Sequence, residues 1–383
     1  MVAGEPSGDL LGAGLLQALT RRWALTHSHP LRIEGIGGPL MMAAGCHSLY
    51  PMERLSVAGL SEVVTRLPEI LSIRRQLIKR FRDDPPDAFI GIDAPDFNIS
   101  LERKLRQSGI PAVHYVSPTV WAWRGYRVKK ISRSVDLMLT IFPFEAEIYT
   151  RRQVAAQFVG HPLADAIPGK RDKGQARREL GLPATGEIVA LLPGSRLNEV
   201  QAMAPPLLQT ARWLTERRPG LEFVVPLVNT ITRNHFEQVR EQEGKGVAIT
   251  VVDNRSRAAM AAADAVAVAA GTATMEALLL QRPSLVVLRV SKLTYHLGKR
   301  MASVDSVGMP NLLAGRRLMP EFVQDNLTAE KLGPAILEIL ENPQAWTATQ
   351  AEFEKIGTTL RKGADESAAA ATLEFLGVKS RSD

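Results

Sequence analysis

Two aspartates follow a short apolar run before residue 100, and their position suits proton-transfer chemistry. The run Ala88–Ile92 predicts a buried strand, and Asp93 and Asp96 come directly after it. Open α/β sheets bind ligands beyond the carboxyl ends of their strands, and Pro95 stops the strand because it has no backbone donor. The pattern favours Asp93 as a general base toward a hydroxyl nucleophile. An Asx turn or a helix cap would use the same residue, and the local sequence leaves these alternatives open.

Small-residue turns recur where a predicted strand passes into a predicted helix. The first is Gly4–Asp9, which is not a GxGxxG motif and therefore gives little support to a dinucleotide site. Free N–H groups at a helix start attract anions, so the turn suits a phosphate. An ordinary turn in which Asp9 caps the helix is the alternative.

Two further turns of this kind lie in the second half of the chain. Arg196 follows Pro193-Gly194-Ser195 and could bind a phosphate through two parallel hydrogen bonds, or be a plain surface arginine. Gly271–Thr274 opens a helix whose N–H groups suit a pyrophosphate, and its threonines add hydroxyl donors. Glu276 could meet ribose hydroxyls, although carboxylates also favour helix starts for dipole reasons alone.

A third group of polar side chains follows the predicted strand Ala112–Val116. The stretch from His114 to Arg124 combines aromatic, hydroxyl and cationic groups that could line an acceptor site. His114, alone on a strand, is more typical of a hydrogen-bonded core residue. Basic residues from Arg124 to Arg133 form one helix face, which suits phosphate or solvent equally.

Repeated strand–helix alternation positions these turns. The predicted strands are 31–36, 88–92, 112–116, 137–141, 188–192, 222–226, 248–252, 265–269 and 284–288, and the main predicted helices are 10–24, 60–81, 200–217, 256–263 and 274–280. The alternation indicates α/β architecture with mostly parallel sheets. Residues 158–178 read as an exposed linker between two Rossmann-like halves. Met1–Ala3 is shorter than a usual buried strand, so we expect a truncated start or a frayed strand.

Composition narrows the class of protein. The chain has 383 residues, a formal net charge of +7 and a single cysteine, Cys46, which excludes an internal disulfide and a cysteine metal cluster. The start lacks a signal-peptide pattern, and no apolar run reaches the roughly 20 residues of a spanning helix, so we expect a cytoplasmic protein. The positive charge favours anionic partners, but no zinc-finger, RNP-like or helix-turn-helix pattern supports nucleic acid.

Taken together, the motifs resemble the lipid-A-disaccharide synthase family of GT-B glycosyltransferases. The resemblance runs across nearly the whole chain in family order. The stretches that carry it are AGEPSGD (3–9), GIDAPDFN (91–98), HYVSPTVWAWR (114–124), GHPLAD (160–165), LLPGSRLNEV (191–200), VVPLVN (224–229), GTATMEALL (271–279) and PNLLAGR (310–316). The departure is at the start, which lacks several apolar residues usually found before VAGE.

The resemblance implies both a fold and a reaction. It implies two Rossmann-like domains, 1–164 for the acceptor and 165–345 for the UDP-sugar, facing across a cleft, followed by C-terminal helices in 346–383. These helices can pack on their own domain, or cross to the first domain or to a partner chain, and the sequence leaves these alternatives open. UDP-2,3-diacylglucosamine would donate its sugar to 2,3-diacylglucosamine 1-phosphate (lipid X), giving a β-1,6 disaccharide 1-phosphate and UDP. The reaction would invert the anomeric centre with no metal and no cofactor. A homodimer is compatible with the resemblance.

The resemblance also assigns residues. Asp93 matches the family's base. The positions expected to hold the nucleotide are Arg196, Gly271, Thr272, Thr274, Glu276 and Asn311. The positions expected to face the cleft and the acceptor are Glu5, Ser7, Gly8, Asp96, Ser117 and Trp123.

The predicted helix before residue 82 is apolar and basic at once. Its apolar residues Val63, Val64, Leu67, Ile70 and Leu71 are accompanied by arginines and lysines, and Pro68 is expected to start a new helical piece. A helix buried on the sheet would show the same spacing. Acylated substrates favour instead a patch that binds the anionic inner membrane peripherally.

Other activities remain open at this level. A related GT-B transferase that adds N-acetylglucosamine to a polyprenyl-linked precursor, or a UDP-sugar 2-epimerase, would share the fold. A catalytically silent nucleotide-sugar-binding or membrane-scaffold protein would not need Asp93 together with Arg196.

Overall fold

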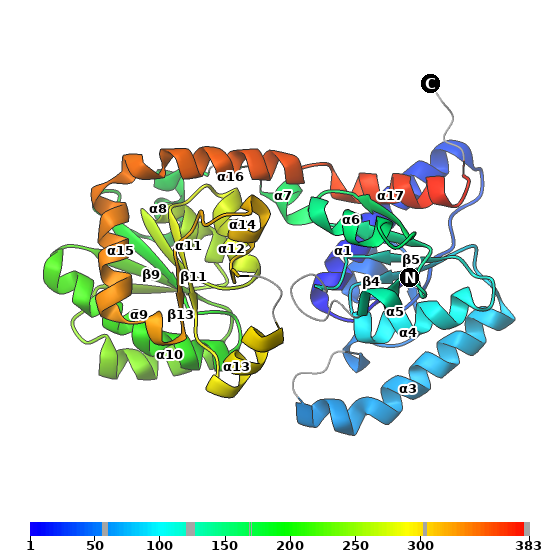
Figure 1. The fold of residues 1–383 in the computed structure, drawn as a ribbon, viewed down its shortest axis with the longest axis horizontal. Coiled ribbons are helices and arrows are strands. Elements are labelled where there is room, and N and C mark those ends of the chain that lie inside the picture. Colours follow the sequence, from blue (N-terminus) through cyan, green and yellow to red (C-terminus); the bar gives the residue numbers. More distant parts are fainter. Residues whose placement is uncertain (56–59, 120–126, 168, 170, 302–304, 379–383) are drawn as a thin grey trace. The chain divides into compact units, whose positions relative to one another are not determined.

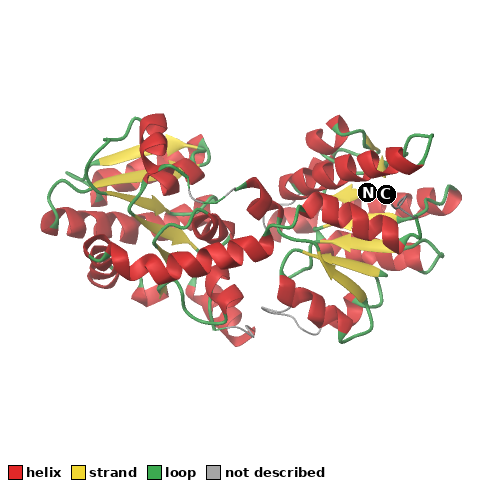
Figure 2. Ribbon diagram, turned by 90° about the horizontal axis from the view of Figure 1, so that it is seen from above, coloured by secondary structure: helices red, strands yellow, loops and turns green. Residues whose placement is uncertain are grey.

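The chain folds into two compact units. The computed structural model describes residues 1–55, 60–119, 127–167, 169, 171–301 and 305–378, with the backbone alone for residues 60–65, 293, 297, 298 and 301. One unit comprises Met1–Asp165 and Leu360–Asp383, and the other comprises Ala166–Thr359. Each has a parallel sheet with helices on both faces (Figure 1, Figure 2). The two-sheet α/β class predicted from the alternating pattern is confirmed.

The sheet of the first unit has the strand order β1-β4-β5-β6-β7, all parallel. Its strands are β1 (Val2–Ala3), β4 (Phe89–Ile92), β5 (Ala112–Tyr115), β6 (Leu137–Thr140) and β7 (Ala155–Phe158). Residues of β4, β5 and β6 are almost fully buried, as expected for parallel strands covered on both faces. A separate pair, β2 (Glu34–Gly35) and β3 (His47–Ser48), is also parallel.

Helices cover this sheet on both sides. They are α1 (Pro6–Thr26), α2 (Pro39–Ala43), α3 (Leu60–Asp83), α4 (Pro95–Arg106), α5 (Val128–Ile131), α6 (Pro143–Thr150), α7 (Pro162–Ala166) and α17 (Ala364–Phe375), with a 3₁₀ turn, η1 (Met52–Arg54). Their apolar residues and the strands form a large buried cluster that includes Leu15, Leu16, Leu77 and Tyr115. A smaller cluster includes Ile131, Met138 and Tyr149.

The last helix belongs to the first unit. Figure 1 shows α17 (red) beside α1 (blue), and the two pack closely. Gly14 allows this approach, because a Cβ there would lie 2.3 Å from the Asp365 carboxylate. Glu366 pairs with Arg21 and Arg22. The start of α17 is held by Asp165, which accepts hydrogen bonds from the backbone N–H groups of residues 363 and 364.

The second unit has a six-stranded parallel sheet in the order β10-β9-β8-β11-β12-β13. Its strands are β8 (Ile188–Leu192), β9 (Glu222–Leu227), β10 (Ile249–Asp253), β11 (Ala265–Ala269), β12 (Ser284–Leu288) and β13 (Glu321–Val323). Its helices are α8 (Lys173–Leu180), α9 (Leu197–Arg217), α10 (Thr230–Glu243), α11 (Ser256–Ala262), α12 (Thr272–Leu279), α13 (Lys292–Met301), α14 (Met309–Ala314), α15 (Ala329–Glu341) and α16 (Thr347–Leu360), with 3₁₀ turns η3 (Gln324–Asn326) and η4 (Pro343–Trp346).

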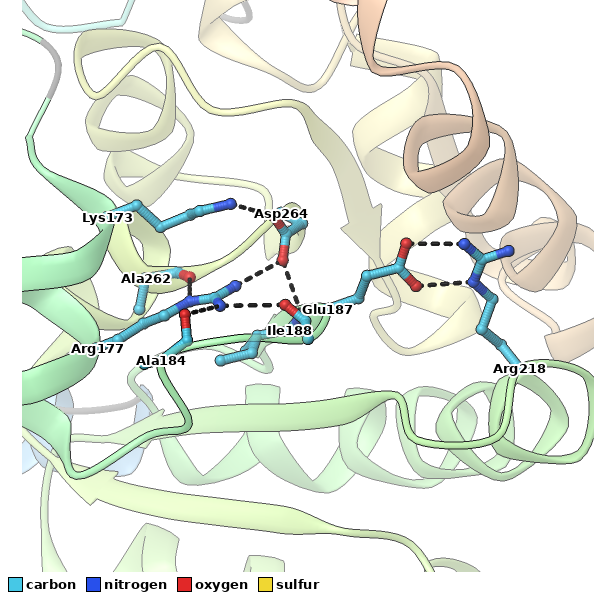
Figure 3. Close-up of polar contacts among 9 residues, drawn as sticks. Lys173, Arg177, Ala184, Glu187, Ile188, Arg218, Ala262 and Asp264 are labelled. Carbon is cyan, nitrogen blue, oxygen red and sulfur yellow. Dashed lines mark hydrogen bonds and ion pairs between the residues drawn. The ribbon is translucent and has the colours of Figure 1, made fainter.

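A buried polar cluster fixes the amino-terminal edge of this second sheet (Figure 3). Arg177 on α8 is 2 % exposed and donates to the carbonyls of residues 184, 186 and 262 and to Asp264. Asp264 also accepts from Lys173 Nζ at 2.6 Å and from the Ile188 N–H at 2.9 Å. The buried charge of Arg177 is therefore fully paired, which is the condition for tolerating a buried cation.

Four sequence-based expectations need correction. Residues 31–36 do not form a strand of the main sheet: only Glu34–Gly35 is a strand, joined to β1 by a single bridge from Ile36. The short strands β7 and β13 were not predicted. The linker 158–178 contains α7 and the start of α8, with Arg177 buried. Pro68 does not start a new helix, because α3 continues through it.

Candidate active site

Asp93 lies in a left-handed turn between β4 and α4. Its φ is 49° and that of Ala94 is 43°, a conformation that costs energy for residues other than glycine. The Asp93 N–H donates to the carbonyl of Tyr115 at 2.9 Å. The N-cap position of α4 belongs to Ala94, and no side chain caps the helix there. Asp93 therefore does not cap α4, and the residue is partly exposed.

Asn98 fastens this turn from inside. Its Nδ2 lies 2.9 Å from the Asp93 carbonyl, 3.1 Å from the Val2 carbonyl and 3.3 Å from the Ile92 carbonyl. The Asn98 side chain is fully buried. One amide thus ties the start of α4 to the ends of both β1 and β4.

The turn after β1 reaches the same edge, because β1 and β4 are parallel neighbours. Glu5 and Ser7 are exposed there, whereas Gly8 is buried against Ala3. Asp9 does not cap α1. It is 3 % exposed and accepts three backbone N–H groups at the start of α2.

The end of β5 is also strained. Val116 has a φ of 77°, which is an outlier for a β-branched residue. Ser117 is 5 % exposed, and its hydroxyl lies 2.9 Å from Tyr149 OH and 3.0 Å from the Pro118 carbonyl. Burial raises the pKa of Tyr149, although Ser117 opposes this. Ser117 is therefore engaged inside the unit rather than presented to solvent, and Trp123 lies outside the described residues.

Asp96 differs from Asp93 in its surroundings. It is exposed in the first turn of α4, and its carboxylate pairs with Arg127. Of the two aspartates that follow β4, Asp93 is thus the one whose carboxylate is not paired with an arginine among the described residues. Glu5, Ser7, Asp93 and Asp96 are thus brought to one sheet edge.

The strand order of the second unit reverses between β8 and β11. From β8 the chain moves to β9 and β10 on one side, and from β11 it moves to β12 and β13 on the other. Open α/β sheets form their binding crevice between two such strands. Arg196 follows β8 and Gly271 follows β11, so the two predicted nucleotide turns lie at the carboxyl ends of these two neighbouring strands.

Arg196 is held by Glu199 at the start of α9. Its Nη1 lies 2.9 Å from Glu199 Oε1, and its side chain is 76 % exposed. Glu199 Oε2 also accepts the N–H of Ser195 at 2.9 Å. The turn requires Gly194, which has a φ of 112° and where a Cβ would lie 2.5 Å from Glu199 Oε2.

The turn at Gly271 is open to a ligand. Gly271 and Thr272 are exposed, and a Cβ at Gly271 would meet nothing within 4 Å among the described atoms. Thr274 differs, because it is buried and its hydroxyl donates to the Gly271 carbonyl at 2.7 Å. Glu276 is positioned by Arg257, whose Nε lies 2.8 Å from Glu276 Oε1.

Asn311 is buried and fully hydrogen-bonded. Its Nδ2 donates to the Met319 carbonyl and to Glu321, both at 2.8 Å, and its Oδ1 accepts from the N–H groups of Leu318 and Met319. The side chain therefore shapes the loop after α14. In the described part of the chain, no group of three His, Cys, Asp or Glu side chains is arranged to hold a metal ion.

Sequence reasoning missed one residue near Asp93. Glu102 on α4 is fully buried and its Oε1 lies 2.6 Å from His114 Nδ1. Burial alone would lower the pKa of His114, but Glu102 and Asp93 raise it above its ordinary value. The sequence feature that could have identified Glu102 is its spacing of four residues from Asn98, which places both on one helix face. This spacing alone does not show that the face points inward.

Comparison with known proteins decides the family. The family model described as lipid-A-disaccharide synthetase matches residues 1–375. A lipid-A-disaccharide synthase from Alkalilimnicola ehrlichii is 49 % identical over 98 % of this chain and 98 % of its own. The enzymes from Hahella chejuensis and Pseudomonas syringae pv. tomato are 46 % and 48 % identical, over 98 % and 99 % of this chain and 93 % and 97 % of their own.

The chain belongs to the lipid-A-disaccharide synthase family. It is therefore a glycosyltransferase of lipid A biosynthesis, as the sequence motifs implied.

Solved structures support the GT-B fold of this synthase. S. aureus MnaA with UDP has a TM-score of 0.61 at 12 % identity, over 97 % of this chain and 96 % of that one. A glycosyltransferase from Rickettsia africae has a TM-score of 0.59 at 10 % identity, over 100 % and 98 %. At such identities the likeness concerns the fold alone. Among the described residues, no helix has the length and apolarity to cross a membrane.

Proposed function

We propose that Asp93 is the general base of disaccharide synthesis. The carboxylate would take the proton of the acceptor 6-hydroxyl of 2,3-diacylglucosamine 1-phosphate. The oxygen would then attack C1 of UDP-2,3-diacylglucosamine, and the bond from C1 to UDP would break with inversion. The observation that carries this role is the strained Asp93–Ala94 turn, which holds a partly exposed carboxylate at a strand's carboxyl end. A base held in place spares the reorganisation that a mobile side chain would need.

The charge that develops on UDP would be stabilised in the second unit. Arg196 and the N–H groups at the start of α12 flank the switch point, and positioned cations and helix starts stabilise anionic leaving groups. The S. aureus neighbour was solved with UDP, which agrees with a nucleotide in this type of crevice. These groups would supply the stabilisation without a metal ion, so EDTA should leave turnover intact.

Nucleotide contacts would come from the groups that remain available. Thr272 is exposed and could donate its hydroxyl, whereas Thr274 and Asn311 are occupied and would act by shaping their turns. Glu276, steadied by Arg257, would accept from ribose hydroxyls. In the first unit, Glu5, Ser7, Gly8 and Asp96 would border the acceptor.

Peripheral membrane association would bring the acylated substrates within reach. Leu67 on α3 is 45 % exposed, and Leu71 is partly buried, but Ile70 packs on the core. The side chains of Val63 and Val64 are outside the described set. Arginines and lysines on the same helix would add attraction to anionic lipid. A homodimer stays a prediction from the resemblance.

Synthesis from defined acyl donors tests this function. Mixing UDP-2,3-diacylglucosamine with lipid X should release UDP and give a tetraacyl disaccharide 1-phosphate by mass spectrometry. UDP-N-acetylglucosamine alone should not be turned over. Epimerisation of UDP-N-acetylglucosamine without disaccharide formation would contradict the proposal.

A further inference from the structure

A buried acid–base pair lies behind the Asp93 turn, and neither of its residues has a role in the proton transfer or the leaving-group stabilisation proposed above. Glu102 on α4 and His114 on β5 are both 0 % exposed, and Glu102 Oε1 lies 2.6 Å from His114 Nδ1. Glu102 Oε2 and His114 Nε2 have no hydrogen-bond partner among the described residues. Buried polar atoms are seldom left this way, and such exceptions call for an explanation.

The chain is adapted to this pair. His114 stands beside Gly91 in the parallel register of β4 and β5. A Cβ at Gly91 would lie 2.1 Å from Glu102 Oε1 and 3.0 Å from Asn98 Cβ. A side chain at this position would displace the Glu102 carboxylate from His114 and crowd Asn98. The absence of a side chain at Gly91 therefore allows a polar helix face to pack directly on the strands.

The same helix face controls Asp93. Asn98, one turn before Glu102, holds the carbonyl of Asp93, while Glu102 holds β5 through His114. The start of α4 is thus fixed to β1 and β4 by one side chain and to β5 by the next. Displacement of Glu102 would shift α4 and with it the turn that carries Asp93.

The charged groups that act on His114 are few. Within the described part of the chain they are Glu102, from α4, and Asp93, from the end of β4. Burial lowers the pKa of His114, but both carboxylates and a backbone hydrogen bond at Val116 raise it, and the net result is a raised pKa. Burial raises the pKa of Glu102, which His114 opposes. Within the described residues, Asp93 is thus one of the two carboxylates that act on the His114 ring.

We propose that Glu102 and His114 are positioning residues for the reaction, a buried hydrogen-bonded pair that fixes α4 to β5 and thereby holds the Asp93 turn in place. This inference rests on the proposed role of Asp93 as the base.

Glu102→Gln tests the inference most cleanly, because it keeps the volume of the side chain but replaces the carboxylate that contacts His114 Nδ1 with a neutral amide, which makes a weaker hydrogen bond. We expect kcat to fall about 10- to 100-fold, as for a small displacement of a reacting group. KM for lipid X and the affinity for UDP should stay near wild type. His114→Gln should give the same fall in kcat with the same unchanged KM.

Leu105→Ala provides the matched control for lost stability. Leu105 is fully buried on the same helix, and its truncation should lower the melting temperature while kcat stays near wild type. If Glu102→Gln and His114→Gln fold and keep the kcat of the wild type, while Asp93→Asn is inactive, the positioning role is wrong and the base assignment stands. If Asp93→Asn itself keeps wild-type turnover, both fail together.

Discussion

The side-chain nitrogen of Asn98 lies 2.9 Å from the backbone carbonyl of Asp93, five residues earlier in the chain. The same nitrogen is within hydrogen-bond distance of carbonyls in β1 and β4. A single buried amide therefore joins the strained turn to two strands. The conformation of Asp93 depends on this contact more than on the intrinsic preference of the residues in the turn.

Asn98→Ala should accordingly impair the reaction and not only the fold. The carbonyl groups would lose their buried donor, at a cost of about 1–3 kcal/mol in unfolding free energy, and kcat should fall while KM changes little. Denaturant unfolding and steady-state kinetics measure the two effects. An unchanged kcat in a destabilised variant would show that Asn98 serves stability alone.

Nucleotide affinity should depend on the switch point of the second unit. Arg196→Ala and Glu276→Ala each remove a charged hydrogen-bonding group, and each should weaken UDP binding by about 1.5–3 kcal/mol. Calorimetric titration with UDP measures this. Arg218→Ala is the control, because Arg218 pairs with Glu187 at the amino-terminal edge of the same sheet. Unchanged affinity in both site variants would refute the placement.

His161 should make the stability of the first unit sensitive to acid. Burial lowers its pKa to about 4, although Asp165 opposes this, and Nδ1 accepts the Leu163 N–H at 3.1 Å. In the unfolded chain the pKa of His161 is near 6.5. Because its pKa is lower in the folded chain, the neutral imidazole contributes fully to stability above pH 6.5, and this contribution is lost as pH falls toward 4. We expect a loss of about 2 kcal/mol at pH 5 relative to pH 7.

His161→Gln should remove that part of the pH dependence in denaturant unfolding. His47→Gln, at an exposed position on β3, should leave the dependence as in the wild type. If the free energy of unfolding changes equally with pH in the wild type and in His161→Gln, His161 is not the source of the acid sensitivity.

The membrane proposal predicts that substitutions on the apolar patch of α3 reduce binding to membranes without lowering the stability of the fold. Replacing Val63, Val64, Leu67 and Leu71 together with serine should reduce pelleting with anionic vesicles and leave the melting temperature nearly unchanged. Leu77→Ser on the same helix is the opposite control, because Leu77 is fully buried and its loss should cost several kcal/mol. A collapsed melt for the fourfold variant would show that its residues belong to the core.

Much of the site followed from sequence because strand ends and turns leave local signals. Asp93, Arg196 and Gly271 each come directly after a buried strand, and parallel strands bring their carboxyl ends to one edge. The prediction that Pro68 begins a new helix was wrong because the cost of a proline inside a helix depends on its exposure. Pro68 lies at an exposed position of α3, so water can bind the backbone carbonyl that loses its hydrogen-bond donor. The short strands β7 and β13 lack the longer apolar run that a strand prediction needs.

Side-chain roles that depend on tertiary contacts could not be foreseen. Asparagine is a suitable residue type for binding a ligand, yet the hydrogen bonds of the Asn311 side chain are all made to residues of the segment that follows it. Glu102 looks like a surface residue of an amphipathic helix, yet it is buried against His114 because Gly91 leaves room. Periodicity places such residues on a face, but only the packed structure shows which way that face points.

Asp93→Asn tests the central claim most directly. The variant keeps the size and polarity of the side chain but cannot accept the proton, so UDP release from UDP-2,3-diacylglucosamine and lipid X should fall about 10²–10⁴-fold. UDP affinity and melting temperature should be unchanged, and Asp96→Asn should stay much closer to wild type. Wild-type turnover by Asp93→Asn, with activity lost in Asp96→Asn, would contradict the account.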